Sequence, residues 1–222
     1  MKPMICVFLL FTSMAGAQTY VSLMGNFGGN VPFLGYEFPD AINVTDKGVN
    51  LSAYAGGGVQ FHLNEYLQFG MECNYELSGE EFDGNIINLV NGRIEYRYKY
   101  LHFPAYIKAS IPLMVPGSVF LAVGPDLAMN IGAIYEWHTG TLSQEIDIDT
   151  STAPVDFGIH ASAGYDLPLS WIVGLLFHVD YYHGFIDIYD DEDQPSSNRI
   201  ELYNRSVKFG ISLYVNIGAT AP

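Results

Sequence analysis

The residues SVKFGISLYVNI at positions 206–217 alternate strictly between a polar or small side chain and an apolar one. A period of two residues is that of a β-strand, in which successive side chains point to opposite faces. A tilted strand needs about 9–11 residues to cross a bilayer, whereas an average globular strand has about 5 or 6. The segment therefore predicts a strand that crosses a membrane.

Seven further segments repeat this alternation. They are residues 20–28, 51–63, 67–76, 94–110, 119–131, 155–166 and 171–182. The alternate side chains of each segment form two rows, one on each face of the strand. In most segments one row is apolar, and the other holds mainly Gly, Ser, Asn, Gln and His with scattered charges of both signs. No segment after Phe11 is apolar for long enough to form a membrane helix, so any span must be a strand. We predict an all-β fold, an eight-stranded antiparallel up-and-down transmembrane β-barrel.

The connections between these segments alternate in length. Short ones lie at residues 64–65, 112–117 and 168–170, and long ones lie at residues 30–50, 78–93, 133–153 and 188–201. Outer-membrane barrels have short periplasmic turns at one rim and long extracellular loops at the other. The pattern therefore predicts this topology in the outer membrane of a Gram-negative bacterium, with both termini in the periplasm.

Alternation alone does not say which row lies inside. The alternative is a soluble, lipocalin-like ligand-binding barrel, which would turn the apolar row inward and expose a face rich in Lys and Glu. The polar row here suits a crowded interior better, because its small residues leave room for large ones. The small residues are Gly56, Gly58, Gly164, Gly174 and Gly210, and the large ones are Glu72, Asp156, His178, Asp180 and Lys208. We expect Lys208 and Ser212 to face the barrel axis, and Phe209, Ile211 and Leu213 to touch lipid.

The segment 94–110 is irregular. Its three tyrosines at the even positions 96–100 hold one phase of the alternation, whereas the apolar residues from Leu101 onward hold the other. One interpretation is a β-bulge near residues 99–101 that shifts the phase. The other is that the tyrosines mark an aromatic girdle and an exposed extension above the bilayer.

The N-terminal residues have the layout of a cleavable signal peptide. Lys2 precedes an apolar run at residues 4–11, which is about half as long as a spanning helix, and small residues follow at 15–17. We expect cleavage after Ala17, which leaves residues 18–222 as a single barrel domain. No cysteine stands at the cleavage site, so a lipid anchor is not expected.

Composition narrows the range of functions. The formal net charge of −15 argues against nucleic acid as a partner, because backbone phosphates must be neutralised by Lys and Arg. The 16 Tyr, 14 Phe and 23 Gly are typical of a β-architecture. After loss of Cys6 with the leader, Cys73 is the remaining cysteine, so no intramolecular disulfide is expected. No cofactor is predicted.

Four short motifs are spaced along the chain. They are YLHFP at 100–104, VGP at 123–125, FGIHASAGY at 157–165 and YNRSV at 203–207. In order and spacing they resemble the PorT-like outer-membrane β-barrel proteins of Bacteroidetes, which implies the same fold and compartment. One departure is the end GATAP at 218–222, where such barrels often carry a terminal aromatic residue that the assembly machinery reads. Because the family's namesake is linked to protein secretion, an accessory role in secretion is suggested by analogy.

These observations predict a structural or interaction role. The partners would be outer-membrane lipids and other envelope or secretion proteins, which meet acidic extracellular loops dotted with aromatic residues, such as IYEWH at 134–138. A diffusion pore is not expected, because about eight strands enclose only enough space for their own side chains.

Two chemical functions are alternatives to this role. A small outer-membrane enzyme acting on lipid could use His160, Ser162, His178 and Asp180, if these meet in the lumen. A buried histidine beside a carboxylate is more often structural, and no nucleophile motif is present, so no catalytic residue is assigned.

Clustered carboxylates in the predicted loops form the second alternative, because such groups can hold calcium. The clusters are Glu145, Asp147 and Asp149, and Asp187, Asp190, Asp191, Glu192 and Asp193. The second cluster lacks the central glycine and the terminal glutamate of a hand-type calcium loop. No metal ligand is therefore assigned.

Overall fold

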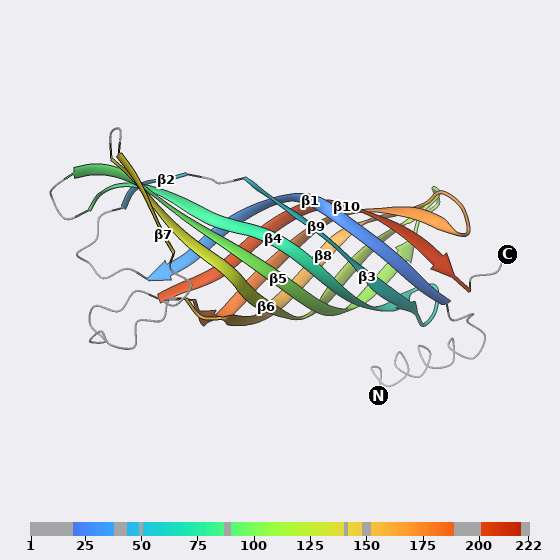
Figure 1. Ribbon diagram of the computed structural model, residues 1–222. Helices are drawn as coiled ribbons and strands as arrows, with labels where there is room; N and C mark the ends of the chain where they lie inside the picture. The colour runs from blue at the N-terminus through green and yellow to red at the C-terminus, as the bar shows by residue number, and fades with distance from the viewer. Residues whose placement is uncertain are drawn as a thin grey trace, which may run out of the picture.

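The computed structural model describes residues 20–37, 44–48, 51–86, 90–139, 142–147, 152–188 and 201–218. Nearly all of them lie in ten β-strands, which wind into the elongated cylinder of Figure 1. The strands are β1 (Tyr20–Glu37), β2 (Val44–Gly48), β3 (Ser52–His62), β4 (Leu67–Ile86), β5 (Val90–Pro112), β6 (Ser118–Thr139), β7 (Leu142–Asp147), β8 (Val155–Pro168), β9 (Val173–Asp187) and β10 (Glu201–Ile217). Within those ranges no helix is long and apolar enough to cross a membrane.

Eight of the strands close the cylinder. They pair in the order β4, β3, β1, β10, β9, β8, β6 and β5, and β5 pairs back with β4. Each of these pairings is antiparallel. The seam between the first and last strands runs from Val21 opposite Ile217 to Glu37 opposite Glu201. The predicted eight-stranded antiparallel barrel is confirmed, and each predicted segment falls on its own strand.

Side chains alternate between the outside and the interior of the cylinder. On β10, Phe209 and Leu213 are 54% and 48% exposed, whereas Lys208 and Ser212 are 2% and 3% exposed. The same alternation on β6 exposes a second apolar row, formed by Val119, Leu121, Val123, Leu127 and Met129. The apolar rows therefore face outward and the polar rows inward, as the lipid-facing prediction requires. The lipocalin-like alternative is wrong, because it needs the opposite arrangement.

Glycines on the inward rows make room for larger neighbours. A Cβ added at Gly58 would lie 2.6 Å from Cγ of Glu72, and one added at Gly210 would lie 2.8 Å from Cε1 of His178. These two positions behave as predicted. The other three glycines accommodate side chains that were not predicted for them: Gly56 lies against Asn74, Gly164 against Phe120, and Gly174 against Tyr214.

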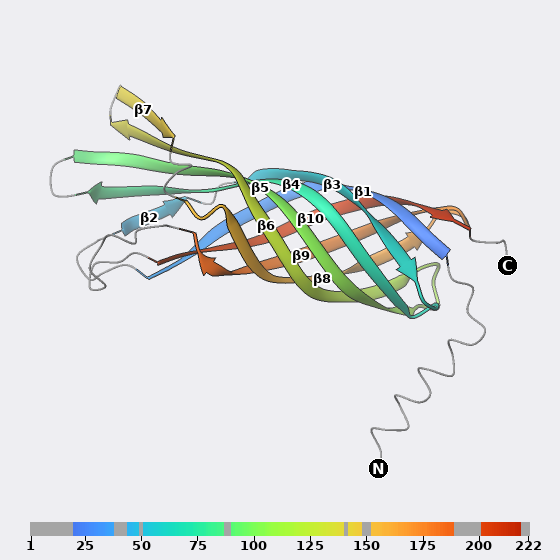
Figure 2. The same ribbon diagram turned by 60° about the horizontal axis from the view of Figure 1, so that its bottom comes forward.

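Some strands continue beyond the rim of the cylinder at the end with the long connections. The pairing of β4 with β5 persists as far as Ile86 opposite Val90. The short strands β2 and β7 pair with the outer parts of β4 and β6. Figure 2 shows β2 and β7 lying with the ends of β4, β5 and β6 outside the cylinder. We call this projecting sheet, made of β2, β7 and residues 79–86, 90–97 and 132–139, the extension.

The extension corrects several predicted boundaries. Much of the predicted loops 78–93 and 133–153 is strand, and β1 runs well past residue 28 to Glu37. In the opposite direction, β9 begins at Val173, so Trp171 belongs to the turn that precedes it. The three predicted short connections are confirmed as tight turns at one rim, which we call the short-turn rim.

The tyrosines of β5 point into the barrel. Tyr98 and Tyr100 are 2% and 1% exposed, and they share the phase of the inward residues His102 and Tyr106 farther along the strand. They therefore form no girdle on the outer surface, and the phase of β5 does not shift at residues 99–101.

The bulge lies in the neighbouring strand. Lys99 pairs with Gly132 and Tyr100 pairs with Asn130, so Ile131 is an extra residue on β6. Before this point the buried residues of β6 include Ala122, Asp126 and Ala128, at even positions, whereas beyond it Ala133, at an odd position, is 1% exposed. The bulge is therefore at the predicted place in the ladder, but its extra residue belongs to β6 and not to the predicted segment. Of the second interpretation, the extension is confirmed and the girdle is wrong.

Candidate functional site in the barrel interior

A cluster of charged side chains is buried deep in the interior. Glu76 on β4 is 0% exposed and forms an ion pair with Lys208 on β10. Its other oxygen accepts a hydrogen bond from Nδ2 of Asn30 at 2.8 Å. Nε2 of His102 lies 3.4 Å from the Glu76 carboxylate, and Nδ1 lies 3.0 Å from that of Asp126. Two carboxylates thus share one lysine and one histidine where water has no access.

A second cluster surrounds Glu72. Its carboxylate accepts hydrogen bonds from Asn26 Nδ2 at 2.7 Å, from Asn74 Nδ2 at 2.9 Å and from the Tyr106 hydroxyl at 2.6 Å. The Tyr106 oxygen in turn accepts a hydrogen bond from Nε2 of Gln60 at 2.9 Å. Such a connected network holds its side chains in one arrangement and satisfies a charge that would otherwise be costly to bury.

A serine, a histidine and an aspartate form a third chain of hydrogen bonds. Nδ1 of His178 lies 2.8 Å from Oδ2 of Asp180, and Nε2 lies 2.9 Å from Oγ of Ser212. Because an ionised carboxylate only accepts, a neutral His178 donates from Nδ1 and accepts the Ser212 proton at Nε2. This is the connectivity of a hydrolytic triad.

The structure brings all four residues considered for an enzyme to one small cavity, and three of them are joined by hydrogen bonds. His178 and Asp180 are in contact, and Ser162 is hydrogen-bonded to Asp180. His160 is stacked on Tyr106, with ring centroids 5.9 Å apart, and borders the same small cavity as the other three. Sequence reasoning misses Ser212, because its contact with His178 depends on how β10 is registered against β9.

The space beside Ser212 is very small. A cavity of about 20 Å³ is lined by Glu72, Lys108, His160 and the serine–histidine–aspartate chain, among others. A volume of this size holds about one water molecule. No organic substrate fits against the Ser212 hydroxyl in this arrangement.

Apolar and aromatic clusters fill the interior toward both ends. Near the short-turn rim the cluster consists of Met24, Phe120, Leu176 and Tyr214. Toward the long connections it consists of Tyr98, Tyr100, Ala128, Ala133, Tyr182 and Ile188. Lys108 lies 4.4 Å above the Phe120 ring and 3.4 Å from the Asp166 carboxylate, so even the cations are packed between other side chains. The part of the barrel that the structure describes is a packed core, as its strand number implies.

Sequence comparison places this barrel in a family. A family model described as "outer membrane protein beta-barrel domain" matches residues 17–190, which is most of the chain. The chain belongs to this family. The protein is therefore an outer-membrane β-barrel, in agreement with its outward apolar rows. Among curated protein sequences, none matches it.

Solved outer-membrane barrels share the fold at low sequence identity. OprG from Pseudomonas aeruginosa has a TM-score of 0.52 and 10% identity, over 89% of this chain and 96% of that chain. Neisserial surface protein A has a TM-score of 0.44 and 11% identity, over 90% and 98% of the two chains. Ail of Yersinia pestis has a TM-score of 0.40 and 10% identity, over 88% and 98%. The likeness to OprG concerns the fold alone.

The acidic clusters considered as an alternative calcium site lie largely outside the described residues. This applies to Asp149 and to residues 190–193. Glu145 and Asp147 belong to β7, and Asp187 ends β9. Calcium binding by these clusters stays a hypothesis.

A separate group of possible metal ligands lies on the extension. Glu95, Glu136 and His138 place their ligand atoms within 4.8 Å of one another. Glu95 lies directly opposite Glu136 in the β5–β6 ladder, an arrangement that is repulsive by itself. Arg97 relieves it, with Nε 2.8 Å from Glu95 and Nη2 3.0 Å from Glu136. The guanidinium already supplies the positive charge that a metal ion would bring, so we assign no metal there.

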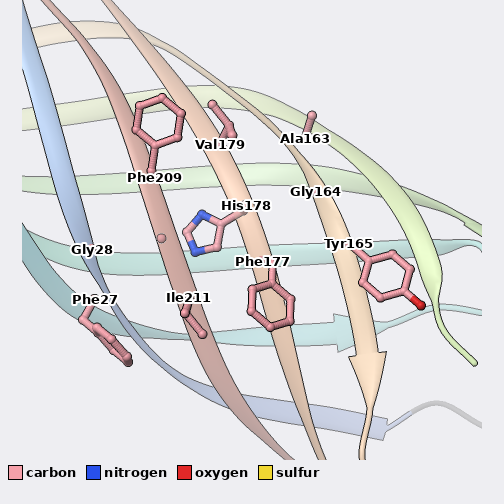
Figure 3. A pocket seen from close by; sticks show the side chains of 11 residues that line it. Phe27, Gly28, Ala163, Gly164, Tyr165, Phe177, His178, Val179, Phe209 and Ile211 are labelled. Atoms are coloured by element: carbon pink, nitrogen blue, oxygen red, sulfur yellow. The ribbon is translucent and has the colours of Figure 1, made fainter.

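The outer wall of the barrel carries an open apolar hollow of about 510 Å³. Figure 3 shows rings of Phe27, Phe177 and Phe209 around it, on β1, β9 and β10. Gly210 lies in its floor, and the His178 ring behind it is hydrogen-bonded to Ser212 in the interior. The hollow belongs to the surface that faces lipid.

Proposed function

We propose that this protein is a rigid outer-membrane barrel with a structural or interaction role, which presents the extension and the long acidic loops to a partner. The observation that carries this proposal is the extension, because a folded five-stranded sheet projects from a barrel whose interior is packed. A packed interior offers a partner or ligand no room, whereas the extension carries accessible charged groups such as Arg97, of which the side chain is 51% exposed. The surface available for recognition is therefore outside the membrane.

We propose an orientation of the barrel in the outer membrane as well, from the lengths of its connections. With residues 1–17 removed as a signal peptide, both ends of the mature chain would lie at the short-turn rim in the periplasm, and the extension would face the outside. Outer-membrane lipids would contact the outward apolar rows. The resemblance of four of its motifs to the PorT-like proteins supports, by analogy, an envelope or secretion protein as the partner of the loops.

We propose a structural role for the Ser212–His178–Asp180 chain. Its connectivity favours an enzyme, but the adjoining cavity holds about one water molecule and the residues are packed inside the barrel. The hydrogen bonds then serve to fix the register of β10 against β9 in the interior, where an unpaired polar group would be costly.

The interaction role predicts which substitutions abolish partner binding. Changing Asp190, Asp191 and Asp193 to Asn and Glu192 to Gln should lower the yield of a cross-linked envelope partner several-fold in pull-downs from solubilised outer membranes, because complementary charge steers association. Ser212→Ala serves as the control and should keep the wild-type yield. If the loop variant retains its partner, or if no partner is recovered in stoichiometric amount, the proposal is wrong.

The structural role of the serine predicts chemical inertness. A fluorophosphonate probe should leave Ser212 unlabelled in the folded protein, and a deletion strain should keep an unchanged lipid A profile. Stoichiometric labelling of the wild type that disappears in Ser212→Ala would instead establish a reactive nucleophile.

A further inference from the structure

The short-turn rim is apolar and exposed. Its turns span residues 63–66, 113–117 and 169–172, and Glu65 is the one charged residue among them. Seven large apolar side chains on this rim are at least 36% exposed, and Leu63 is partly buried. The seven are Tyr66, Leu113, Met114, Val115, Leu169, Trp171 and Ile172. Exposed apolar surface that is gathered at one place marks an interaction site.

The rim continues the outward apolar rows without a break. On β10 the outward positions from Ile217 to Val207 carry no charge, and the first charged residue is Arg205. On β5 the corresponding first charge is Lys99. With a rise of about 3.3 Å per residue and a tilt of about 40°, the stretch from Arg205 to Ile217 spans about 30 Å along the membrane normal. The apolar band of such barrels is about 25 Å tall, so a band that begins at Arg205 ends close to the turns.

The backbone of the turn at 169–172 is paired within the protein. Oγ of Ser170 accepts hydrogen bonds from the N–H groups of Ile172 and Val173 at 3.2 and 3.1 Å. Asn216 donates its N–H to the Ile172 carbonyl at 2.7 Å and its Nδ2 to the Trp171 carbonyl at 3.0 Å. The exposed side chains of this turn are apolar, while these backbone N–H and carbonyl groups form hydrogen bonds within the protein.

In the turn at 113–117, backbone polar groups are also paired within the protein or replaced by proline. Pro112 and Pro116 have no N–H to satisfy. The Pro116 carbonyl accepts a hydrogen bond from the Tyr165 hydroxyl, and the Leu113 N–H donates to the Gly117 carbonyl at 3.0 Å. Backbone groups that are already paired can enter a region poor in water without losing hydrogen bonds.

We propose that the short-turn rim is inserted into the membrane, at the boundary between phospholipid headgroups and acyl chains, and does not stand free in water. Lipid is the occupant that the observations favour, because the rim is continuous with the lipid-facing rows, is almost free of charge and carries Trp171, a residue type enriched at this boundary. The rim thereby sets the depth of the barrel in the bilayer. This inference is independent of the proposed function.

Tryptophan fluorescence tests the insertion of one turn. The chain has two Trp, so Trp137→Phe leaves Trp171 as the single reporter and Trp171→Phe leaves Trp137 on the extension as the control. In phosphatidylcholine vesicles, Trp171 should emit at shorter wavelength than Trp137. It should lose most of its emission to lipids brominated near the headgroup and little to aqueous iodide. Equal quenching of the two residues by iodide, without quenching by lipid, would overturn the proposal.

A spin label tests the second turn separately. With Cys73 changed to Ser, a nitroxide at Met114→Cys should collide more often with oxygen and less often with a water-soluble nickel chelate than one at Gln144→Cys, which is exposed on the extension. If the rim instead docks on a protein, both reporters will be aqueous in these lipid-only vesicles. That outcome would also overturn insertion.

Discussion

Replacing Lys208 with Met is expected to lower the free energy of unfolding by about 3–5 kcal/mol, the usual cost of leaving one member of a buried ion pair without its partner. Glu76 is 0% exposed, and among the described residues the carboxylate would keep the nearby His102 ring and the hydrogen bond donated by Asn30, but no lysine to balance its charge. Urea unfolding in phosphatidylcholine vesicles, followed by the heat-modifiable mobility of the barrel, measures the change.

Two further variants separate charge from packing. Lys99→Met makes the same chemical change at a less buried, outward position and should alter stability by no more than about 0.5 kcal/mol. Adding Glu76→Gln to Lys208→Met should recover part of the loss, because no uncompensated charge is then buried. A loss in Lys208→Met as small as that in Lys99→Met would show that Glu76 does not rely on this lysine.

Gly210→Ala is expected to destabilise the barrel by about 1–3 kcal/mol through overpacking. A methyl group at this position would meet the Tyr54 hydroxyl and would lie 2.8 Å from Cε1 of His178. Both neighbours belong to the packed interior, and His178 is held on either side by Asp180 and Ser212. The same urea titration in vesicles reports the effect.

The Tyr54 hydroxyl provides a rescue for this defect. It is buried, and within the described part of the chain it has no hydrogen-bond partner, so Tyr54→Phe should cost little by itself. Combined with Gly210→Ala, it should restore part of the lost stability. Gly25→Ala is the matched control, because a Cβ there meets nothing within 4 Å. Equal destabilisation by Gly25→Ala would point to strand propensity and not to crowding.

The barrel is predictable from the sequence because lipid imposes a strict period of two. Residues 206–217 follow that period throughout, and both rows are where the alternation places them. The ends of β4, β5 and β6 are not predictable in this way. Beyond the membrane both faces of a sheet can be polar, so the apolar signal stops at about Leu101 although the hydrogen-bonded ladder continues to Val90.

Some of the interior contacts can be predicted from the sequence and others cannot. His178 and Asp180 are two residues apart on one strand, so period two alone places them side by side. To predict the Ser212 contact, one must know the register of β10 against β9. To predict the ion pair of Glu76 with Lys208, one must also know how the whole sheet curves. β4 and β10 are separated by β3 and β1 in the sheet, so this pair meets only because the sheet curves into a narrow cylinder.

The seam between β1 and β10 has a consequence for how the chain reaches its native state. Val21 must find Ile217, so the ladder that joins the first strand to the last brings together the two most distant parts of the described chain. Contacts of such large sequence separation slow folding, because the entropy of closing the loop is lost before the contact stabilises anything. Until then both edge strands remain unpaired and the apolar rows lack lipid, so the nascent barrel depends on protection from aggregation until its last strand has emerged.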